Sequence, residues 1–177
     1  MRIVPVEDQD LALVKKLLEE VNLSGAGIDQ HFHHFLKLIL DGELVAVAGL
    51  EVYDNVGLLR SLAVVPEYRH SGLGRGLTRA MINKARSLGL TQLYLVTETA
   101  TDYFYRFGFR IIEWEQADPL LRQSEQFCSP RPKSAVCMYI KRRCQLCTFS
   151  FSSAGIALFS RKYLIVEQNA VLSSWRP

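Results

Sequence analysis

The chain has 177 residues, of which 49% are hydrophobic and 22% are charged, so it is long enough for one domain with a hydrophobic core and has the composition of an ordinary globular protein. Its formal net charge is +3, but six Lys or Arg and one Asp or Glu lie from Lys141 onward, which leaves residues 1–140 slightly negative. A nucleic-acid-binding face is therefore not expected on the main body.

Nothing in the chain resembles a targeting or membrane segment. The stretch MRIVPVEDQD carries three acidic residues and no apolar run, unlike a secretory signal. The stretch CTFSFSSAGIALF is too short and too rich in serine to span a bilayer. With four cysteines and no signal, reduced thiols are expected. These features predict a cytoplasmic protein with no membrane partner and no nucleic-acid partner.

Hydrophobic periodicity and turn residues alternate between strand and helix patterns along residues 1–140. In chain order they predict a strand at Ile3–Val6, helices at Asp8–Val21 and Ile28–Leu36, strands at Leu36–Leu40, Leu44–Tyr53 and Leu58–Val65, a helix at Gly74–Leu88, a strand at Gln92–Thr99, a short helix at Asp102–Phe107 and strands at Phe109–Trp114 and Ser134–Ile140. A polar connection with proline separates the last two strands. This order predicts one mixed α/β domain over residues 1–140.

The remaining residues, Lys141–Pro177, are rich in Ser, Cys and basic residues and show no clear period. We expect a tail of unknown role, which is either disordered, loosely packed or derived from an expression vector, or else functional. Within it, Phe159–Val166 has the pattern of a strand or a helix. Cys144 and Cys147 have zinc-ligand spacing, but Cys128 and Cys137 are irregularly placed relative to them. We therefore expect free thiols and no metal site.

The stretch VVPEYRHSGLGRGLTRAM (64–81) places Gly72, Gly74 and Gly76 where a strand gives way to a helix. Without side chains there, the amides of the turn and of the first helical turn can point at one bound anion, and the helix dipole adds to the attraction. A P-loop would need Gly-Lys-Ser/Thr, and a dinucleotide fingerprint would need glycine where Leu77 stands. The stretch predicts a different phosphate site, with an ordinary tight turn as the alternative.

RHSGLG, preceded by LAVVPEY, matches the pattern Arg/Gln-x-x-Gly-x-Gly/Ala and resembles the coenzyme A pyrophosphate loop of the GNAT superfamily of acetyl-CoA-dependent N-acetyltransferases. TETATDYFYRFGF is similar to a later segment of that family, and the resemblance covers about residues 1–140. GLEVY, LLRSLAV, LYLVTETA and SEQF…PKSAVCM look most similar to the arsenic-resistance-associated branch, although Arg131-Pro132 stands where members often have Cys-Pro.

The resemblance implies the GNAT fold: a central mixed sheet flanked by helices, whose fourth and fifth strands splay apart so that the thioester of acetyl-CoA enters between them. Backbone groups of Leu62, Ala63 and Val64 would pair with the pantetheine arm. Thr97 and Phe104 would lie near the coenzyme. The pyrophosphate would be bound by Arg69, His70, Ser71, Gly72, Leu73, Gly74, Arg75 and Gly76. Dimers are common among relatives, so a homodimer is a further possibility.

The residue that often protonates the leaving thiolate in this family is replaced here. The family often has a tyrosine four residues before the glycine of GF, and here that residue is Phe104. Tyr103 and Tyr105 flank it, but each helical step turns a side chain by about 100°. Tyr103, Tyr105 or water could act as the acid, and core packing is the alternative for both tyrosines.

Glu51 and Arg60 are charged residues in otherwise apolar strands. If DNVG forms a four-residue turn ending at Gly57, Glu51 lies directly opposite Arg60, and a slip of two leaves them diagonal neighbours. Arg60 would hold an anionic group of the substrate, while Glu51 orients Arg60 or relays the amine proton. A structural ion pair under a helix is the alternative. Glu98 is a second base candidate, or an exposed carboxylate at a strand end.

His31, His33 and His34 form a cluster in HFHHF, but no carboxylate or cysteine at convincing spacing completes a metal site. A solvated helix face is expected, with a substrate contact as the alternative. The resemblance to the GNAT superfamily implies an N-acetyltransferase that acts by direct attack on a primary amine of a small molecule. Arg60 and the narrower branch resemblance favour an acidic amino acid or amino-acid-like toxin as that molecule. The alternatives are a non-catalytic acyl-CoA-binding sensor or interaction module, and a protein acetyltransferase.

Overall fold

A computed structural model describes residues 1–130 and 132–141. The interpretations of Cys144, Cys147 and Phe159–Val166 lie outside these residues, and the division of the chain at residue 140 stays a prediction. In the described part, no helix combines the length and the apolar character that crossing a membrane would require.

The described elements follow the predicted order, with 3₁₀ helices (η) at several connections. They are β1 (Arg2–Pro5), η1 (Asp8–Asp10), α1 (Leu11–Glu20), η2 (Ile28–His34), β2 (Leu36–Leu40), β3 (Glu43–Tyr53), β4 (Val56–Val64), η3 (Pro66–Tyr68), α2 (Leu73–Ser87), β5 (Gln92–Thr97), α3 (Thr101–Tyr105), β6 (Arg110–Ile112), η4 (Trp114–Gln116), η5 (Pro119–Gln123), α4 (Glu125–Cys128) and β7 (Val136–Lys141). The predicted mixed α/β class is confirmed.

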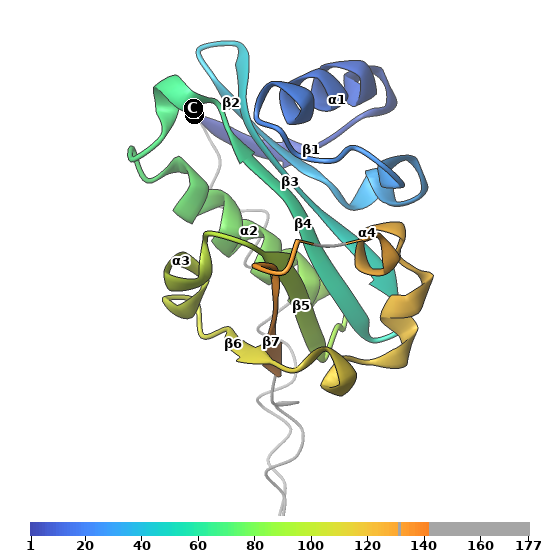
Figure 1. Cartoon of the computed structure of the whole chain (residues 1–177). Coiled ribbons are helices and arrows are strands. Elements are labelled where there is room, and N and C mark those ends of the chain that lie inside the picture. Colours follow the sequence, from blue (N-terminus) through green and yellow to red (C-terminus); the bar gives the residue numbers. More distant parts are fainter. Residues whose placement is uncertain (131, 142–177) are drawn as a thin grey trace, which may run out of the picture. The chain divides into compact units, whose positions relative to one another are not determined.

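The strands of the described residues form one seven-stranded sheet in the order β1-β2-β3-β4-β5-β7-β6, in which β4 and β5 pair in parallel and the other neighbours are antiparallel. Because successive side chains alternate along a strand, β3 sends Ala48 and Leu50 to one face and Val47 to the other. The first face packs against α2 and α3, and the second against α1, η2, η5 and α4. Figure 1 shows α2 and α3 on one side of the sheet and α1 and α4 on the other.

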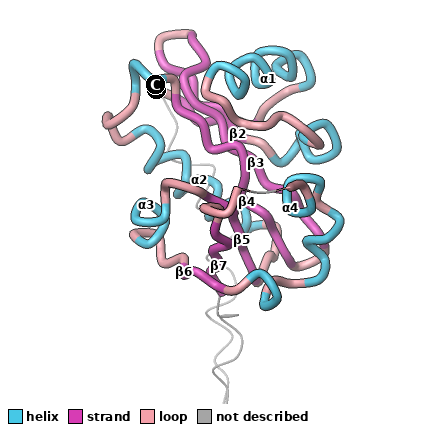
Figure 2. The backbone as a smooth tube through the Cα atoms, viewed as in Figure 1, coloured by secondary structure: helices cyan, strands magenta, loops and turns pink. Residues whose placement is uncertain are grey.

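The polar connection after β6 is more structured than its sequence predicts. It contains η4, η5 and α4, seen in Figure 2 as helical turns joined by short loops. Leu121 and Phe127 from this segment are buried against Leu58 and Tyr94 of the sheet. The predicted strand at Phe109–Trp114 ends earlier, at Ile112, because Glu113 and Gln116 form a capping box that starts η4.

The predicted separation of the fourth and fifth strands is confirmed. Their parallel ladder runs from Val56 and Gln92 to Leu59 and Leu95 and stops there, although β4 continues to Val64. At the same point the pairing of β4 with β3 slips by one residue, and Ser61 adopts a φ of 54°. This β-bulge turns the second half of β4 away from its regular path, as bulges beside functional sites often do.

Candidate functional site

The glycine loop joins the end of β4 to α2 through backbone that favours an anion. Gly72 has a φ of 86° and caps α2 without a side-chain hydrogen bond. The Gly76 amide donates to the Gly72 carbonyl at 3.1 Å, which starts the helical ladder. The amides of Leu73 to Arg75 precede that ladder and have no acceptor inside the helix, so they are available to a ligand.

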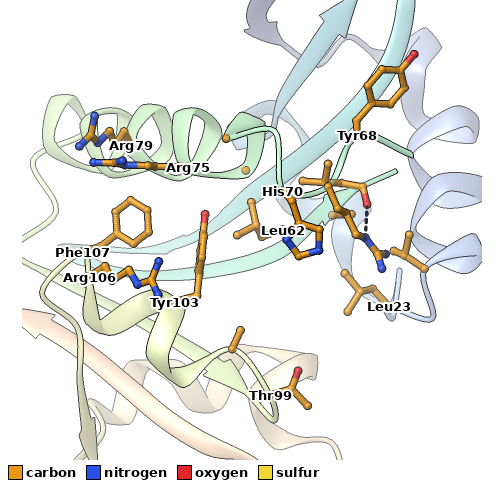
Figure 3. A pocket seen from close by; sticks show the side chains of 17 residues that line it. Leu23, Leu62, Tyr68, His70, Arg75, Arg79, Thr99, Tyr103, Arg106 and Phe107 are labelled. Atoms are coloured by element: carbon orange, nitrogen blue, oxygen red, sulfur yellow. Dashed lines mark hydrogen bonds between the residues drawn. The ribbon is translucent and has the colours of Figure 1, made fainter. Parts of the chain in front are cut away.

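A cleft of about 1020 Å³ opens beside this loop, here called the first cleft (Figure 3). It is lined by Val21, Leu23, Leu62, Ala63, Val64, Tyr68, Arg69, His70, Gly72, Gly74, Arg75, Arg79, Thr99, Ala100, Tyr103, Arg106 and Phe107. Most of the residues predicted to bind a coenzyme are among them. Ser71 of this loop, and Leu73 and Gly76 in the first turn of α2, do not line the cleft.

The first cleft is strongly cationic. Arg69, Arg75, Arg79 and Arg106 line it, and no Asp or Glu does among the described residues. Arg69 turns back so that its Nε donates to the Val64 carbonyl at 3.0 Å, which ties the loop to the end of β4. A cleft with these charges and a free helix N-terminus suits a ligand that carries several phosphate groups.

A second cleft, of about 630 Å³, adjoins the first where β4 and β5 separate. The two clefts share Leu23, Leu62, Thr99, Ala100 and Tyr103. The rest of the second cleft is lined by Asn22, Ser24, Leu59, Arg60, Ser61, Leu95, Val96, Thr97, Glu98, Phe104, Gln126, Ser129, Pro130, Pro132 and Ala135. The shared wall would allow a group held in one cleft to reach a group held in the other.

Arg60 and Glu51 form a buried ion pair at the edge of the second cleft. Arg60 Nη1 donates to Glu51 Oε1, and the two side chains are 0% and 2% exposed. A four-residue turn would have placed the two residues directly opposite each other. The β3–β4 turn instead contains two residues, Asp54 and Asn55, so the pairing differs. Glu51 therefore faces Leu58, and Arg60 faces Gly49. The pair is a diagonal one, which was the alternative register.

Further hydrogen bonds hold the pair in place. Arg60 Nε donates to Ser61 Oγ at 3.2 Å, and Arg60 Nη2 donates to the Ser24 carbonyl at 3.3 Å. On the other side, the Tyr53 hydroxyl donates to Glu51 Oε2 at 2.9 Å. Burial raises the pKa of Tyr53, and the hydrogen bond and charge of Glu51 raise it further. Arg60 lines the second cleft, whereas Glu51 lies behind it and lines neither cleft.

The two candidate tyrosines occupy different surroundings. Tyr103 lines both clefts, and its hydroxyl lies 2.7 Å from Thr78 Oγ1. Burial raises the pKa of Tyr103 above its ordinary value. Tyr105 is 39% exposed, lies outside both clefts and stacks with the guanidinium of Arg110. Phe104 is buried in the core beside Phe109 and also lines the second cleft.

The two candidate residues at the end of β5 line the second cleft but already have partners. Thr97 Oγ1 accepts from the Ala100 amide at 3.1 Å and so shapes the turn into α3. Glu98 Oε2 accepts from Ser134 Oγ at 3.3 Å, near the surface. Glu98, unlike Glu51, can be reached directly from the cleft.

The histidine cluster does not form a metal site. The described residues contain no group of three or more His, Cys, Asp or Glu placed to hold a metal ion. His31 packs edge-on against Tyr53, and its Nδ1 accepts from the Val52 amide at 3.5 Å. The rings of His33 and His34 are 3.9 Å apart. Burial, and then the charges of His33, Lys84 and His31, lower the pKa of His34 to about 4.

Gln126 is a site residue that the sequence did not predict. It lies on α4, lines the second cleft, and its Oε1 is buried with no donor among the described residues. A buried amide oxygen without a donor is costly, and such groups are rare unless a ligand or water satisfies them. Nothing in the polar connection distinguishes this glutamine from Gln116 or Gln123, so only the packing of α4 reveals it.

Comparison with known proteins identifies the family. The model described as the acetyltransferase (GNAT) family matches residues 7–109. The chain belongs to this family. The match includes the glycine loop, both strands that separate, and α3.

Curated GNAT relatives include the amino-acid acetyltransferase of Mannheimia succiniciproducens, 31% identical over 113 residues, which are 63% of this chain and 24% of that protein. The amino-acid acetyltransferase of Pseudomonas syringae pv. syringae is 33% identical over 109 residues, covering 60% of this chain and 23% of that protein. The chain therefore spans about a quarter of the length of these curated relatives.

Solved structures share the GNAT fold. N-acetylglutamate synthase from Neisseria gonorrhoeae, complexed with coenzyme A and N-acetyl-glutamate, superposes with a TM-score of 0.68 at 22% identity, covering 81% of this chain and 35% of that one. A Mycobacterium tuberculosis protein in complex with coenzyme A gives a TM-score of 0.69 at 20% identity, covering 80% of this chain and 99% of that one. The narrower resemblance to the arsenic-resistance branch stays a prediction.

Proposed function

We propose that this protein transfers the acetyl group of acetyl-CoA to the primary amine of an amino acid or an amino-acid-like toxin. The observation that carries the proposal is the junction of the two clefts where β4 and β5 separate. One cleft is cationic and borders the glycine loop, and the other contains a buried arginine. The names of the curated relatives support an amino-acid acceptor.

The residues of the first cleft fit coenzyme A. The free amides at the start of α2 and the guanidinium of Arg75 would bind its pyrophosphate. The second half of β4, which leaves β5 at Leu59, offers Leu62 to Val64 as a strand edge for the pantetheine arm. A Cβ on Gly74 would lie 3.4 Å from Val64 Cγ2 and 3.5 Å from the Tyr103 hydroxyl. Glycine at this position therefore leaves the space between these two side chains open.

Acetyl-CoA would supply an activated thioester, and the chain would position the amine and handle the protons. Arg60 has five N–H donors, and Glu51, Ser24 and Ser61 occupy only part of them, so a substrate carboxylate could accept from the rest. Glu98 would take a proton from the amine, directly or through water. The hydroxyl of Tyr103, on the shared wall, would donate a proton to the departing thiolate.

Glu51 has a different role in this proposal from that of a base. Arg60 and Tyr53 occupy its two oxygens, and its side chain lies behind the cleft wall. It would fix the orientation of Arg60 and is therefore a positioning residue. The ion pair would keep the guanidinium aimed at one place, as preorganised recognition of a carboxylate requires.

The experiment is a measurement of thiol release from acetyl-CoA with a panel of amino acids, polyamines, aminoglycosides, and phosphinic and arsinic amino-acid analogues. Turnover on one acidic amino acid, lost in Arg60→Ala while coenzyme affinity persists, is the expected result. Because Arg60→Ala leaves a buried carboxylate unpaired, the double variant Arg60→Leu/Glu51→Leu serves as a second test that preserves packing. Activity retained by a folded double variant would contradict the role of Arg60.

A second candidate function is an acyl-CoA-binding sensor or interaction module, which the phenylalanine at position 104 favours. That side chain is buried against Phe109 and offers no proton at the usual place of the acid. Tight coenzyme binding with no turnover on any amine would support this module. Acetylation of a protein is less favoured, since Leu23 and Ser24 of the loop after α1 form part of the wall of the second cleft. A homodimer stays a prediction.

A further inference from the structure

Two of the arginines that line the first cleft, Arg79 and Arg106, lie outside the glycine loop. Arg79 lies four residues after Arg75 on α2, slightly more than one helical turn or about 6 Å farther from the loop. Arg106 directly follows α3 and lines the same cleft. In Figure 3, Arg75 and Arg79 extend from α2, and Arg106 projects from the end of α3. Both distal guanidinium groups belong to exposed residues that line the cleft.

The positive charges of these two side chains are not neutralised by a salt bridge to any carboxylate of the described residues. Among the described residues, neither Arg79 nor Arg106 takes part in a salt bridge. Asp102 lies four residues before Arg106, the spacing at which a helix commonly forms an ion pair, yet no such pair is formed. Two guanidinium groups without a salt bridge, one on α2 and one directly after α3, instead offer a site for an anion with several oxygens.

Coenzyme A carries one anionic group more than the pyrophosphate assigned above to the glycine loop. Besides the pyrophosphate, it carries a third phosphoryl group on the 3′ oxygen of its ribose. We propose that Arg79 and Arg106 bind this 3′-phosphate, so that the protein distinguishes coenzyme A from the form that lacks it. The proposal rests on the proposed function, because it requires the pyrophosphate to lie at the glycine loop. It assigns a specificity site to residues outside the loop motif.

The test compares the binding of coenzyme A and 3′-dephospho-coenzyme A by calorimetry at one fixed salt concentration. The unaltered protein should bind coenzyme A about tenfold more tightly than the dephospho form, since the difference is one pair of partly exposed charge contacts. Arg79→Ala/Arg106→Ala should remove that preference and leave the affinity for the dephospho form unchanged. Arg86→Ala is the matched control, because Arg86 is exposed on the same helix and lies outside the cleft.

Three outcomes would overturn the inference while leaving the proposed function intact: equal affinity of the unaltered protein for both forms, a preference that survives in the double variant, and an equal loss of affinity for both forms in that variant. The last would mean that the two arginines only attract anions generally. Failure of the unaltered protein to bind either form would instead contradict the proposed function itself. The double variant should weaken the binding of adenosine 3′,5′-bisphosphate, measured as a competitor, to the same extent as the binding of coenzyme A.

Discussion

Arg60 on β4 donates a hydrogen bond to Glu51 on the neighbouring strand β3, although the two residues do not lie directly opposite each other. Arg60 faces Gly49, and Glu51 faces Leu58, so the pair crosses the ladder diagonally. Gly49 is needed there, because a Cβ would come within 2.2 Å of the Phe35 ring, which covers this face of the sheet. Both side chains are buried, and of the two residues Arg60 lines the second cleft whereas Glu51 does not.

Removing one partner of this pair should cost much stability. Glu51→Ala would leave the Arg60 guanidinium buried and uncompensated, and we expect a loss of about 3–5 kcal/mol in the free energy of unfolding. The double variant Glu51→Leu/Arg60→Leu should regain most of that loss, because well-packed apolar side chains often replace buried ion pairs at little cost. Urea denaturation measures both. A loss below about 1 kcal/mol in Glu51→Ala would mean that water reaches the guanidinium.

Tyr103 and Tyr105 should differ in catalysis. Tyr103→Phe removes a hydroxyl from the shared wall of the clefts, and we expect kcat to fall about tenfold, less than for most general acids because a thiolate needs little help to leave. Tyr105→Phe should change nothing. Because burial raises the pKa of Tyr103 above its ordinary value, no loss of kcat from this group is expected in the neutral and mildly alkaline range. Equal rates in both variants would leave water as the acid.

Gly72 and Gly42 provide a matched pair for the anion loop. Both have a positive φ, 86° and 91°, and at both a Cβ would meet nothing within 4 Å. Alanine should therefore destabilise each site by about 1–2 kcal/mol through backbone strain alone. Gly72→Ala should also weaken coenzyme A binding about tenfold or more, because this residue lines the first cleft. Similar coenzyme affinities in the two variants would contradict the assignment of the loop.

Stability should depend on the protonation of His34. Its pKa is about 4 in the folded chain and 6.5 in the unfolded chain, so the unfolded state binds the proton first as the pH falls. The stability contributed by neutral His34 is complete above pH 6.5 and is lost as the pH falls toward 4. After solvent screening we expect a loss of about 1 kcal/mol.

His34→Gln should reduce this acid dependence of the melting temperature. His70→Asn is the control, since asparagine tolerates the positive φ of 62° at that position. An unchanged pH dependence in His34→Gln would show that other groups cause it.

Gln126 should contribute to substrate binding at some cost in stability. Gln126→Leu removes a buried oxygen that has no donor among the described residues, so the free energy of unfolding should stay constant or rise by about 1 kcal/mol. The same change should raise KM for the amine about tenfold while kcat changes little. Exposed Gln123 on η5 offers a control at Gln123→Leu. A loss of stability without an effect on KM would make Gln126 a purely structural residue.

The sequence predicted the order of the elements because each major element has a clear local signal. The apolar stripe of α1, the Asp41–Gly42 turn with φ values of 51° and 91°, and Gly89 after α2 all act within a few residues. The glycine loop is local in the same sense. Its three glycines and the adjoining arginines lie in one stretch, so most of the first cleft could be predicted.

The second cleft could be predicted only in part, since it depends on register and distant packing. The turn at Asp54 has two residues and not the four assumed from the sequence. Glu51 and Arg60 are therefore diagonal neighbours and do not lie directly opposite each other. The bulge at Ser61 places a non-glycine residue at positive φ, which no local pattern indicates. Gln126 joins the cleft because Leu121 and Phe127 bury their side chains against the sheet, a contact between segments far apart in the chain.

The most direct test of the account is to quantify both products of one reaction. Purified protein is incubated with acetyl-CoA and the preferred amino acid, and free thiol and N-acetylated amino acid are measured together by colorimetry and mass spectrometry. The account predicts equal amounts of the two products, with both strongly reduced in Gly72→Ala and unaffected in Gly42→Ala. Thiol release without an acetylated amine, or no product from any amine despite tight coenzyme binding, would contradict it.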